Sequence, residues 1–384
     1  MFNFTAPLPL ALYVHFPWCL AKCPYCDFNS HSVHGTIPEA AYLAALVEDL
    51  ETMLPRVWGR AVGSVFIGGG TPSLLSPEGL ARLLSDLRAR LMLTADVEIT
   101  LEANPGTVEQ GRFAEFRDAG INRLSLGIQS FQDELLHRLG RVHNAGEARH
   151  AAETARRAGF DNLNVDLMYG LPGQSVAEAE TDLAEAIALE PTHLSRYQLT
   201  IEPNTAFGHA PPALPKEDTI AAMEEAGHTR LADNGFEQYE VSAFARAGFR
   251  CRHNLNYWQF GDYLGIGAGA HGKITEPQRP AIVRLWKERH PQHYMEAGAA
   301  RTAGERALTN QDAAFEFMLN ALRLSDGFET ALFADRTGQP VTAVERPLAE
   351  AERRGLIEWN VQHIRPTERG RRFLNDLLEL FLPA

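Results

Sequence analysis

The chain has 384 residues, of which 22% are charged and 45% are hydrophobic, and its formal net charge is −13. This composition is typical of a folded globular protein and excludes a disordered or fibrous one. The acidic balance argues against a general nucleic-acid binder. Four cysteines are too few for a disulfide framework. Three of them lie close together, which indicates that they have a chemical role and that the protein works in a reducing compartment.

Nothing in the sequence predicts a membrane span or a leader. No run approaches the roughly 20 apolar residues that a spanning helix needs. The first 21 residues lack Lys, Arg, Asp and Glu, but Pro7, Pro9 and Pro17 interrupt any signal-peptide helix. We therefore expect a cytoplasmic protein, which can also associate peripherally with a membrane.

The first half of the chain alternates strand patterns with helix patterns. Strands are expected at Leu10–Phe16, Val62–Ile67, Val97–Glu102, Arg123–Ile128, Leu163–Met168 and His193–Ile201. Helices with a 3.6-residue period are expected at Pro38–Leu54, Pro77–Leu91, Val108–Ala119, Ala145–Ala158 and Val176–Leu189. This alternation predicts an α/β fold with a parallel sheet, either an open doubly wound sheet or a partial barrel. In both, functional side chains gather at the carboxyl ends of the strands.

The pattern weakens after Pro203. A helix is expected at Asp218–Asn234 and a strand at Gln238–Val241, whereas Cys251–Gly272 fits neither period. From about Leu308 a helical, arginine-rich tail predicts a small winged-helix-like module, and its charge is too small for a nucleic-acid surface. We therefore predict a core domain over residues 1–275, a connecting segment over 276–307 and a C-terminal domain over 308–384.

Three cysteines, Cys19, Cys23 and Cys26, form a C-x3-C-x2-C pattern directly after the first expected strand. Pro24 lies inside this span and disfavours a helix, so a loop over residues 19–26 is expected. Three thiolates in a loop favour an iron–sulfur cluster. A zinc site completed by His31 or His34, and three inert cysteines, are the alternatives. Because a [4Fe–4S] cluster uses four ligands, three thiolates leave one iron open.

This spacing resembles the radical S-adenosylmethionine (SAM) superfamily, in which SAM chelates the open iron through its amino and carboxylate groups. The resemblance implies a partial (β/α)6 barrel and a [4Fe–4S] cluster on Cys19, Cys23 and Cys26. It also implies a set of SAM-binding residues near the strand ends: Tyr13, Tyr25, Gly69, Gly70, Thr71, Glu102, Gln129, Arg141 and Asp166. From the residues alone, the three glycines at 68–70 fit a plain loop equally well, and Glu102 or Asp166 fits a helix cap.

A narrower resemblance comes from a set of motifs: YVHFPWC, CPYCDFNS, GGGTPS, LEANPG, GIQSF and NVDLMYGLPGQ. Together they resemble the oxygen-independent coproporphyrinogen III oxidase family over about residues 8–275, and the tail resembles its C-terminal domain. The sequence departs from the decarboxylating members of that family in three ways, and in each of them it resembles the heme chaperone branch. Phe28 stands where the decarboxylating enzymes carry a fourth cysteine, only 18 residues precede Cys19, and the segment 253–258, HNLNYW, matches the HNxxYW motif.

The resemblance implies a chaperone that binds heme and passes it to acceptor proteins while keeping a cluster and an exchangeable SAM. The alternative is an oxidative decarboxylase of coproporphyrinogen III, which the phenylalanine at position 28 disfavours. The acidic charge argues against a third class, a radical enzyme that modifies RNA. The implied partners are heme and heme-accepting proteins, membrane-associated respiratory proteins among them, with no nucleic acid and with a homodimer as one assembly.

The heme candidates are His253, Tyr257, Trp258 and His271. An imidazole ligates iron well, and the two aromatic rings offer flat apolar surface to a macrocycle. Equally, His253 fits a structural hydrogen-bonding role, Trp258 fits a core position, and His271 fits a place against SAM. A buried, inert thiol is expected for Cys251.

Overall fold

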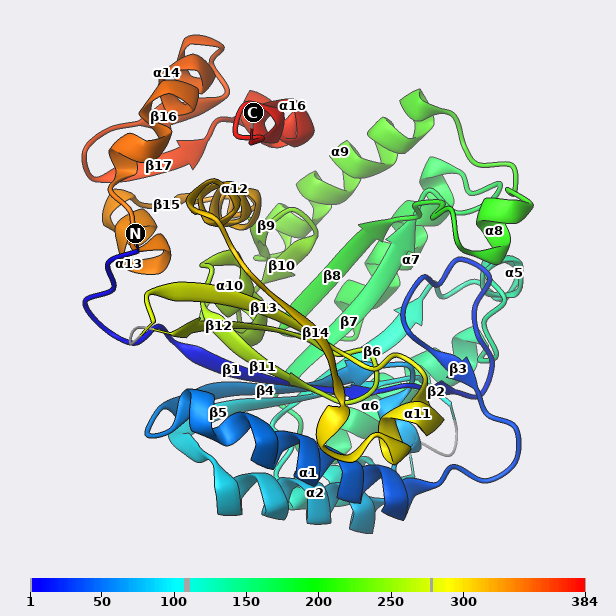
Figure 1. Ribbon diagram of the computed structural model, residues 1–384. Coiled ribbons are helices and arrows are strands. Elements are labelled where there is room, and N and C mark those ends of the chain that lie inside the picture. The colour runs from blue at the N-terminus through cyan, green and yellow to red at the C-terminus, as the bar shows by residue number, and fades with distance from the viewer. Residues whose placement is uncertain (1, 107–110, 277–278, 384) are drawn as a thin grey trace.

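The computed structural model describes residues 2–106, 111–276 and 279–383. Within these ranges, the main sheet has the strand order β14-β13-β12-β11-β1-β4-β5-β6-β7-β8-β10-β9 (Figure 1). Neighbours from β11 through β1 to β8 are parallel, and the pairs on both flanks are antiparallel. The parallel centre has the strands β1 (Leu10–Phe16), β4 (Ala61–Gly69), β5 (Met92–Ala103), β6 (Arg123–Gln129), β7 (Asn162–Tyr169), β8 (His193–Gln198) and β11 (Asp262–Ile266). The flanks are β9 (Glu237–Glu240), β10 (Ala243–Ala245), β12 (His271–Glu276), β13 (Ala281–Lys287) and β14 (Thr302–Ala307).

Helices cover the outside of this curved sheet, where α1 and α2 lie side by side (Figure 1). Their bounds are α1 (Glu39–Val57), α2 (Pro77–Arg90), α4 (Phe113–Ala119), α5 (Asp133–Arg138), α6 (Ala145–Arg157), α7 (Val176–Ala188), α8 (Ala206–His209), α9 (Glu217–Asp233), α10 (Arg252–Trp258) and α11 (Pro291–Glu296). The helix α6 shows why the pattern folds as it does. Asn144 and Glu147 form a capping box at its start, and its buried side is a stripe of alanines that allows close approach to the sheet. The predicted α/β fold with a partial barrel is confirmed.

The structure differs from the sequence expectation in two stretches. The segment 251–272, which fitted neither period, holds α10 and β11, and β11 pairs in parallel with β1. The segment 276–307, expected to connect two domains, holds β13, α11 and β14, so it extends the main sheet. The expected helix at Val108–Ala119 is described only in part, because residues 107–110 lie outside the described ranges; α4 accounts for its second half.

The C-terminal part has a small core of its own. It contains the helices α12 (Asn310–Ala321), α13 (Thr330–Thr337), α14 (Glu345–Arg353), α15 (Glu368–Arg372) and α16 (Leu374–Glu379), with the strands β15 (Phe328–Glu329), β16 (Ile357–Trp359) and β17 (His363–Pro366). The three strands form an antiparallel sheet. Phe2 packs into this core, and the Asn3 backbone N donates to the Gly338 carbonyl over 2.9 Å. The first residues therefore tie the C-terminal part to the start of β1.

In the described ranges, no helix combines the length and the apolar character that crossing a membrane requires.

Candidate functional site

The cysteine loop is framed by a two-residue parallel pair, β2 (Trp18–Cys19) with β3 (His31–Ser32). Between them the chain forms a turn, in which the Cys26 backbone N donates to the Cys23 carbonyl over 3.1 Å. The cysteines at 19, 23 and 26 are half-buried free thiols that line one cavity of about 320 Å³. Burial raises the pKa of the Cys19 thiol. The expected loop therefore brings the three thiols to one cavity.

This first cavity opens at the carboxyl ends of β4 to β8. All the residues expected to contact SAM, except one, line it together with the cysteines: Tyr25, Gly69, Gly70, Thr71, Glu102, Gln129, Arg141 and Asp166. The exception, Tyr13, lines a neighbouring cavity and donates its hydroxyl proton toward the ring of His15, with 2.8 Å between Oη and Nδ1. The individual SAM contacts remain predictions, but the structure brings these residues together.

Arginine side chains give the first cavity unused donors. Arg141 donates to the Cys23 Sγ at 3.6 Å and to the Asn104 Oδ1 at 2.7 Å. Its Nε, and the Nε of Arg123, are buried and have no hydrogen-bond partner within the described part of the chain. Both side chains line the cavity. Buried donors without partners are costly, so they fit a cavity that takes a ligand with acceptor oxygens or nitrogens, as SAM has.

Two carboxyl groups face the same cavity. The Glu102 Oε2 accepts from the Gly69 backbone N at 3.0 Å, and Asp166 accepts from Ser125 at 3.2 Å and from Asn164 at 2.8 Å. Burial, together with the nearby Asp166 charge, raises the pKa of Glu102 to about 7. Burial also raises the pKa of Asp166. At the ends of the helices that the structure describes, neither carboxyl acts as a cap; both are held as polar cavity walls.

The glycines at the end of β4 have both a conformational and a steric reason to be glycine. Gly69 has φ +117°, a conformation that side-chain-bearing residues rarely adopt. A Cβ on Gly70 would lie 2.5 Å from the Trp18 carbonyl oxygen, because the loop packs directly on the chain before the cysteines. At the end of β6, Gln129 also has a positive φ of 70°, which is uncommon for a residue that is not glycine. Strained backbone of this kind concentrates at functional sites.

The cysteine arrangement bears on the zinc alternative. A single zinc ion requires its ligands to converge on one point at bond distances of about 2.0–2.3 Å. Among the residues that the structure describes, no group of three His, Cys, Asp or Glu side chains is arranged for one metal ion. The cysteines bind a larger inorganic group more readily, because each thiolate of a cluster attaches to a different iron.

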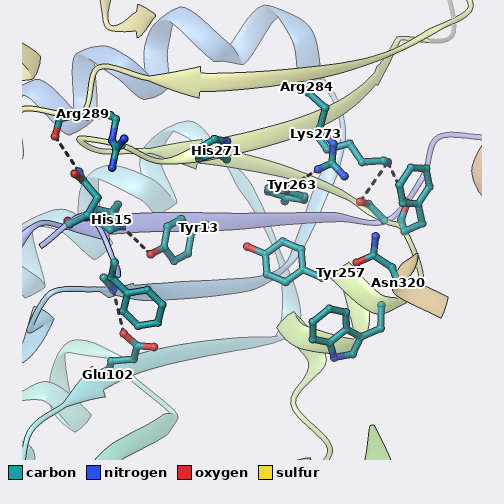
Figure 2. Close-up of a pocket in the computed structure, with 17 residues that line it drawn as sticks. Tyr13, His15, Glu102, Tyr257, Tyr263, His271, Lys273, Arg284, Arg289 and Asn320 are labelled. Carbon is teal, nitrogen blue, oxygen red and sulfur yellow. Dashed lines mark hydrogen bonds between the residues drawn. The ribbon is translucent and has the colours of Figure 1, made fainter. Parts of the chain in front are cut away.

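A second cavity of about 490 Å³ adjoins the first and shares Phe28, Gly69 and Glu102 with it (Figure 2). Its wall is rich in aromatic and cationic side chains: Tyr13, Tyr257, Trp258, Phe260, Tyr263, His271, Lys273, Arg284 and Arg289. Two of these cations are neutralised, since Lys273 pairs with Asp262 at 2.8 Å and Arg284 pairs with Glu316 at 2.5 Å. Within the described ranges, Arg289 has no ion-pair partner. The cavity thus combines flat apolar rings with one uncompensated cation.

The structure separates the heme candidates into two groups. Tyr257, Trp258 and His271 line the second cavity. His253 lies behind its wall, 1% exposed, with Nδ1 3.0 Å from the Ser64 hydroxyl and Nε2 2.9 Å from the Tyr257 hydroxyl. Burial lowers the pKa of His253 to about 3, so the ring is neutral. Both of its nitrogens are engaged, which is the arrangement of a structural histidine. The expected buried thiol of Cys251 is also found, with no exposed surface.

Several cavity residues escaped the sequence reasoning. They are Arg123, Ser125, Asn164, Met168, Ser195, Tyr197 and Asn254. Most of them occupy every second position on β6, β7 and β8, and alternate strand positions face the same side. Reading β7 and β8 with a period of two back from their predicted end residues, Met168 and Ile201, would have identified Asn164, Ser195 and Tyr197, whereas the same reading from Ile128 on β6 selects the opposite face.

Comparisons with known proteins agree with this geometry. Residues 13–186 match the radical SAM superfamily, and residues 308–373 match the HemN C-terminal domain. The chain is 50% identical to "Heme chaperone HemW" of Escherichia coli (strain K12), over 97% of this chain and 98% of that protein. It is 34% identical to the protein of the same name from Bacillus subtilis (strain 168), over 96% and 98%.

A solved structure supports the fold. The coproporphyrinogen III oxidase HemN from Escherichia coli superposes with a TM-score of 0.82 over 98% of this chain and 90% of that chain, at 23% sequence identity. Members of the radical SAM superfamily carry a [4Fe–4S] cluster and SAM, and the thiols, unpartnered donors and cavity described above fit both groups. The chain therefore belongs to the heme chaperone HemW family of the radical SAM superfamily.

Proposed function

We propose that this chain is a heme chaperone, which binds heme in the second cavity and passes it to acceptor proteins. The observation that carries this proposal is the shared wall between the two cavities. The helix α10 contributes Asn254 to the first cavity and Tyr257 and Trp258 to the second. A heme in the second cavity would thus lie beside a SAM in the first.

The chemistry of the second cavity suits a flat, anionic macrocycle. Aromatic rings supply the apolar area on which a porphyrin stacks. Arg289, which has no ion-pair partner among the described residues, supplies a positive charge for a porphyrin carboxylate. The relatives named heme chaperone span almost the whole chain, which supports extending their ligand class to this cavity.

The first cavity has a different task. Cys19, Cys23 and Cys26 would hold the cluster, and Arg141 and Asp166 would orient SAM through its polar groups. When bound, the cluster supplies an electron that can cleave the sulfonium bond of SAM. The protein's own part is to keep this cavity polar and partly closed, with Tyr25 packed against Phe207 at its edge.

The competing activity is decarboxylation of coproporphyrinogen III. Phe28 bears on it directly, because this ring is 61% exposed and lines both cavities at the position where the decarboxylating enzymes carry a cysteine. We propose that Phe28 serves as an apolar wall for heme.

We further propose that the acceptors include membrane-associated respiratory proteins, that the protein associates peripherally with membranes, and that it forms a homodimer.

The test is a heme titration of anaerobically reconstituted protein. We expect saturable binding of ferric heme with a Soret shift, followed by transfer to apomyoglobin as a neutral acceptor. Trp258→Ala should weaken binding, whereas Trp58→Ala, which removes a ring that is 80% exposed outside both cavities, controls for adsorption to surface aromatics. If the wild type binds no heme but converts coproporphyrinogen III to protoporphyrinogen IX, the chaperone proposal is wrong.

A further inference from the structure

Tyr257 occupies a central place in the second cavity. Its ring projects from α10 into the space between Tyr13 and Asn320, with the hydroxyl turned toward Tyr13 (Figure 2). Edge contacts with His253 and Tyr263 hold the ring, at centroid distances of 4.8 and 4.5 Å. The phenol is therefore fixed before any ligand enters.

The hydroxyl of Tyr257 differs from two other polar side chains of this cavity, His15 and Tyr263. His15 is engaged at both nitrogens, by the Tyr13 hydroxyl at 2.8 Å and by the Asn29 carbonyl at 2.9 Å. The Tyr263 oxygen accepts from the Arg284 guanidinium at 2.6 Å. The Tyr257 hydroxyl instead lies 2.9 Å from the Nε2 of the buried, neutral His253 imidazole, which can accept from it or donate to it. In either case the oxygen keeps at least one lone pair for the cavity.

The partner imidazole is held at both nitrogens. Its Nδ1 lies 3.0 Å from the Ser64 hydroxyl on β4 and its Nε2 lies 2.9 Å from the Tyr257 hydroxyl, and because both hydroxyls can donate or accept, either tautomer satisfies both contacts. The backbone N of His253 donates to Glu98 at 3.2 Å, which fixes the start of α10 against β5. Tyrosine is an established axial ligand of heme iron, and a hydrogen bond to a neighbouring base increases its phenolate character.

We propose that the Tyr257 oxygen is the protein ligand of ferric heme iron and that His253 is a positioning residue behind it. This inference rests on the proposed heme-binding function. On binding, the oxygen–iron bond forms and the O–H bond breaks. The phenolic proton is released to solvent, and His253 stays neutral with its own proton on Nε2, which donates to the phenolate across the 2.9 Å contact while Nδ1 accepts from the Ser64 hydroxyl. The iron remains ferric, so no oxidant or reductant is needed.

The first experiment is spectroscopic and uses the full-length protein. Wild-type protein loaded with ferric heme should show a phenolate-to-iron charge-transfer band and phenolate modes in resonance Raman spectra. Tyr257→Phe keeps the ring and its edge contacts, and it should lose both signals. His253→Ala should keep phenolate ligation with a shifted band, and His271→Ala should leave the signals unchanged. Loss of the signals in His271→Ala, or their absence from the loaded wild type, would overturn the assignment.

The second measurement separates iron ligation from porphyrin binding. Metal-free protoporphyrin IX has the same shape and carboxylates but no iron. Tyr257→Phe should bind ferric heme at least roughly tenfold more weakly, about 1.4 kcal/mol, and bind protoporphyrin IX as the wild type does. Equal affinity of Tyr257→Phe and wild type for ferric heme would refute the ligand role. If wild-type protein binds neither porphyrin, the proposed function itself fails, and the ligand assignment fails with it.

Discussion

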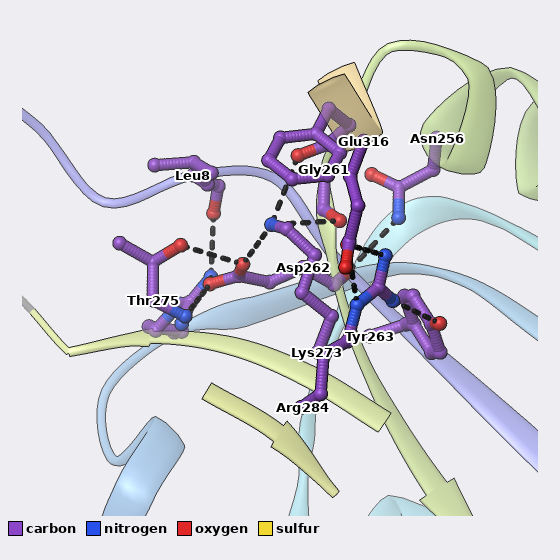
Figure 3. Close-up of polar contacts among 11 residues, drawn as sticks. Leu8, Asn256, Gly261, Asp262, Tyr263, Lys273, Thr275, Arg284 and Glu316 are labelled. Atoms are coloured by element: carbon purple, nitrogen blue, oxygen red, sulfur yellow. Dashed lines mark hydrogen bonds and ion pairs between the residues drawn. The ribbon is translucent and has the colours of Figure 1, made fainter. Parts of the chain in front are cut away.

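A buried ion pair closes one end of the second cavity and permits a sharp stability prediction. Asp262 begins β11 opposite Leu10 of β1 and is fully buried. Its carboxylate accepts from Lys273 at 2.8 Å, from Arg60 at 2.9 Å, and from the backbone N and hydroxyl of Thr275, both at 2.9 Å (Figure 3). Burial alone would raise the pKa of Asp262, but the two cations outweigh it and hold the pKa below its ordinary value.

Asp262→Asn keeps the shape and removes the charge. The ammonium of Lys273, 1% exposed, would remain buried with neutral acceptors and no anion beside it; the Phe260 and Gly261 carbonyls lie at 3.0 and 3.4 Å. Removing one partner of a buried ion pair lowers the free energy of unfolding by about 3–5 kcal/mol. Because the folded pKa of Asp262 is depressed, its contribution is present above the ordinary Asp pKa and is lost as the pH falls through the folded value.

Denaturant unfolding at neutral pH measures this cost as a lower midpoint at unchanged slope. Glu358→Gln is the matched control, since its ion pair with Arg365 joins side chains that are 60% and 55% exposed, and such pairs contribute at most about 1 kcal/mol. Adding Lys273→Met to Asp262→Asn should restore part of the loss, because the fully buried ammonium is then gone and only Arg60, whose side chain is 13% exposed, lacks its anion. If Asp262→Asn and Glu358→Gln cost the same, the reasoning is refuted.

Other predictions concern the first cavity. Replacing any one of Cys19, Cys23 and Cys26 by Ser should abolish the absorbance of a reconstituted cluster, whereas Cys251→Ser should leave it intact; an equal requirement for Cys251 would contradict the three-thiolate scheme. Gly70→Val should lower both SAM affinity by calorimetry and stability by about 1–3 kcal/mol, because its Cβ would lie 2.5 Å from the Trp18 carbonyl; an unchanged melting temperature would refute this. Since burial beside Asp166 raises the pKa of Glu102 to about 7, the free energy of unfolding should fall as the pH rises from about 4.5 to about 7. Glu102→Gln should flatten that decline in pH-dependent denaturation, and an identical profile would show that Glu102 does not titrate there.

The parallel half of the fold was accessible from the sequence because its signals are local. Each strand from β1 to β8 in the parallel centre is a short apolar run that ends in polar or glycine residues, as at Gly68–Thr71. Parallel strands bring such ends to one edge. The sequence therefore predicts that residues such as Glu102 and Asp166 meet in one cavity at this edge of the sheet.

The second cavity was not accessible in this way. It depends on β11 pairing with β1 across about 250 residues of chain, in the register of Leu10 with Asp262. A hydrophobic period predicts that a strand exists but not which edge it joins. Contacts such as Asn29 Nδ2 to the Arg289 carbonyl, at 2.9 Å, likewise join segments whose proximity has no local signal.

The role of His253 shows the same limit on a smaller scale. Residue type alone favours an imidazole as the iron ligand in HNLNYW. Our proposal of a positioning role for His253 rests instead on its burial and its partners, and both depend on the packing of α10 against Ser64 of β4 and Glu98 of β5. A helix pattern places Tyr257 four residues after His253, hence on the same face. It does not tell which of the two meets the cavity.

The placement of α10 also explains how one short helix serves both cavities. Its first turn is fixed from behind, because Glu98 accepts from the backbone N of Arg252 and of His253, each at 3.2 Å. Asn254 then faces the cysteine side, and Tyr257 faces the porphyrin-sized cavity less than one turn later. The cluster cavity and the proposed heme cavity therefore share one structural element in their walls, the helix α10.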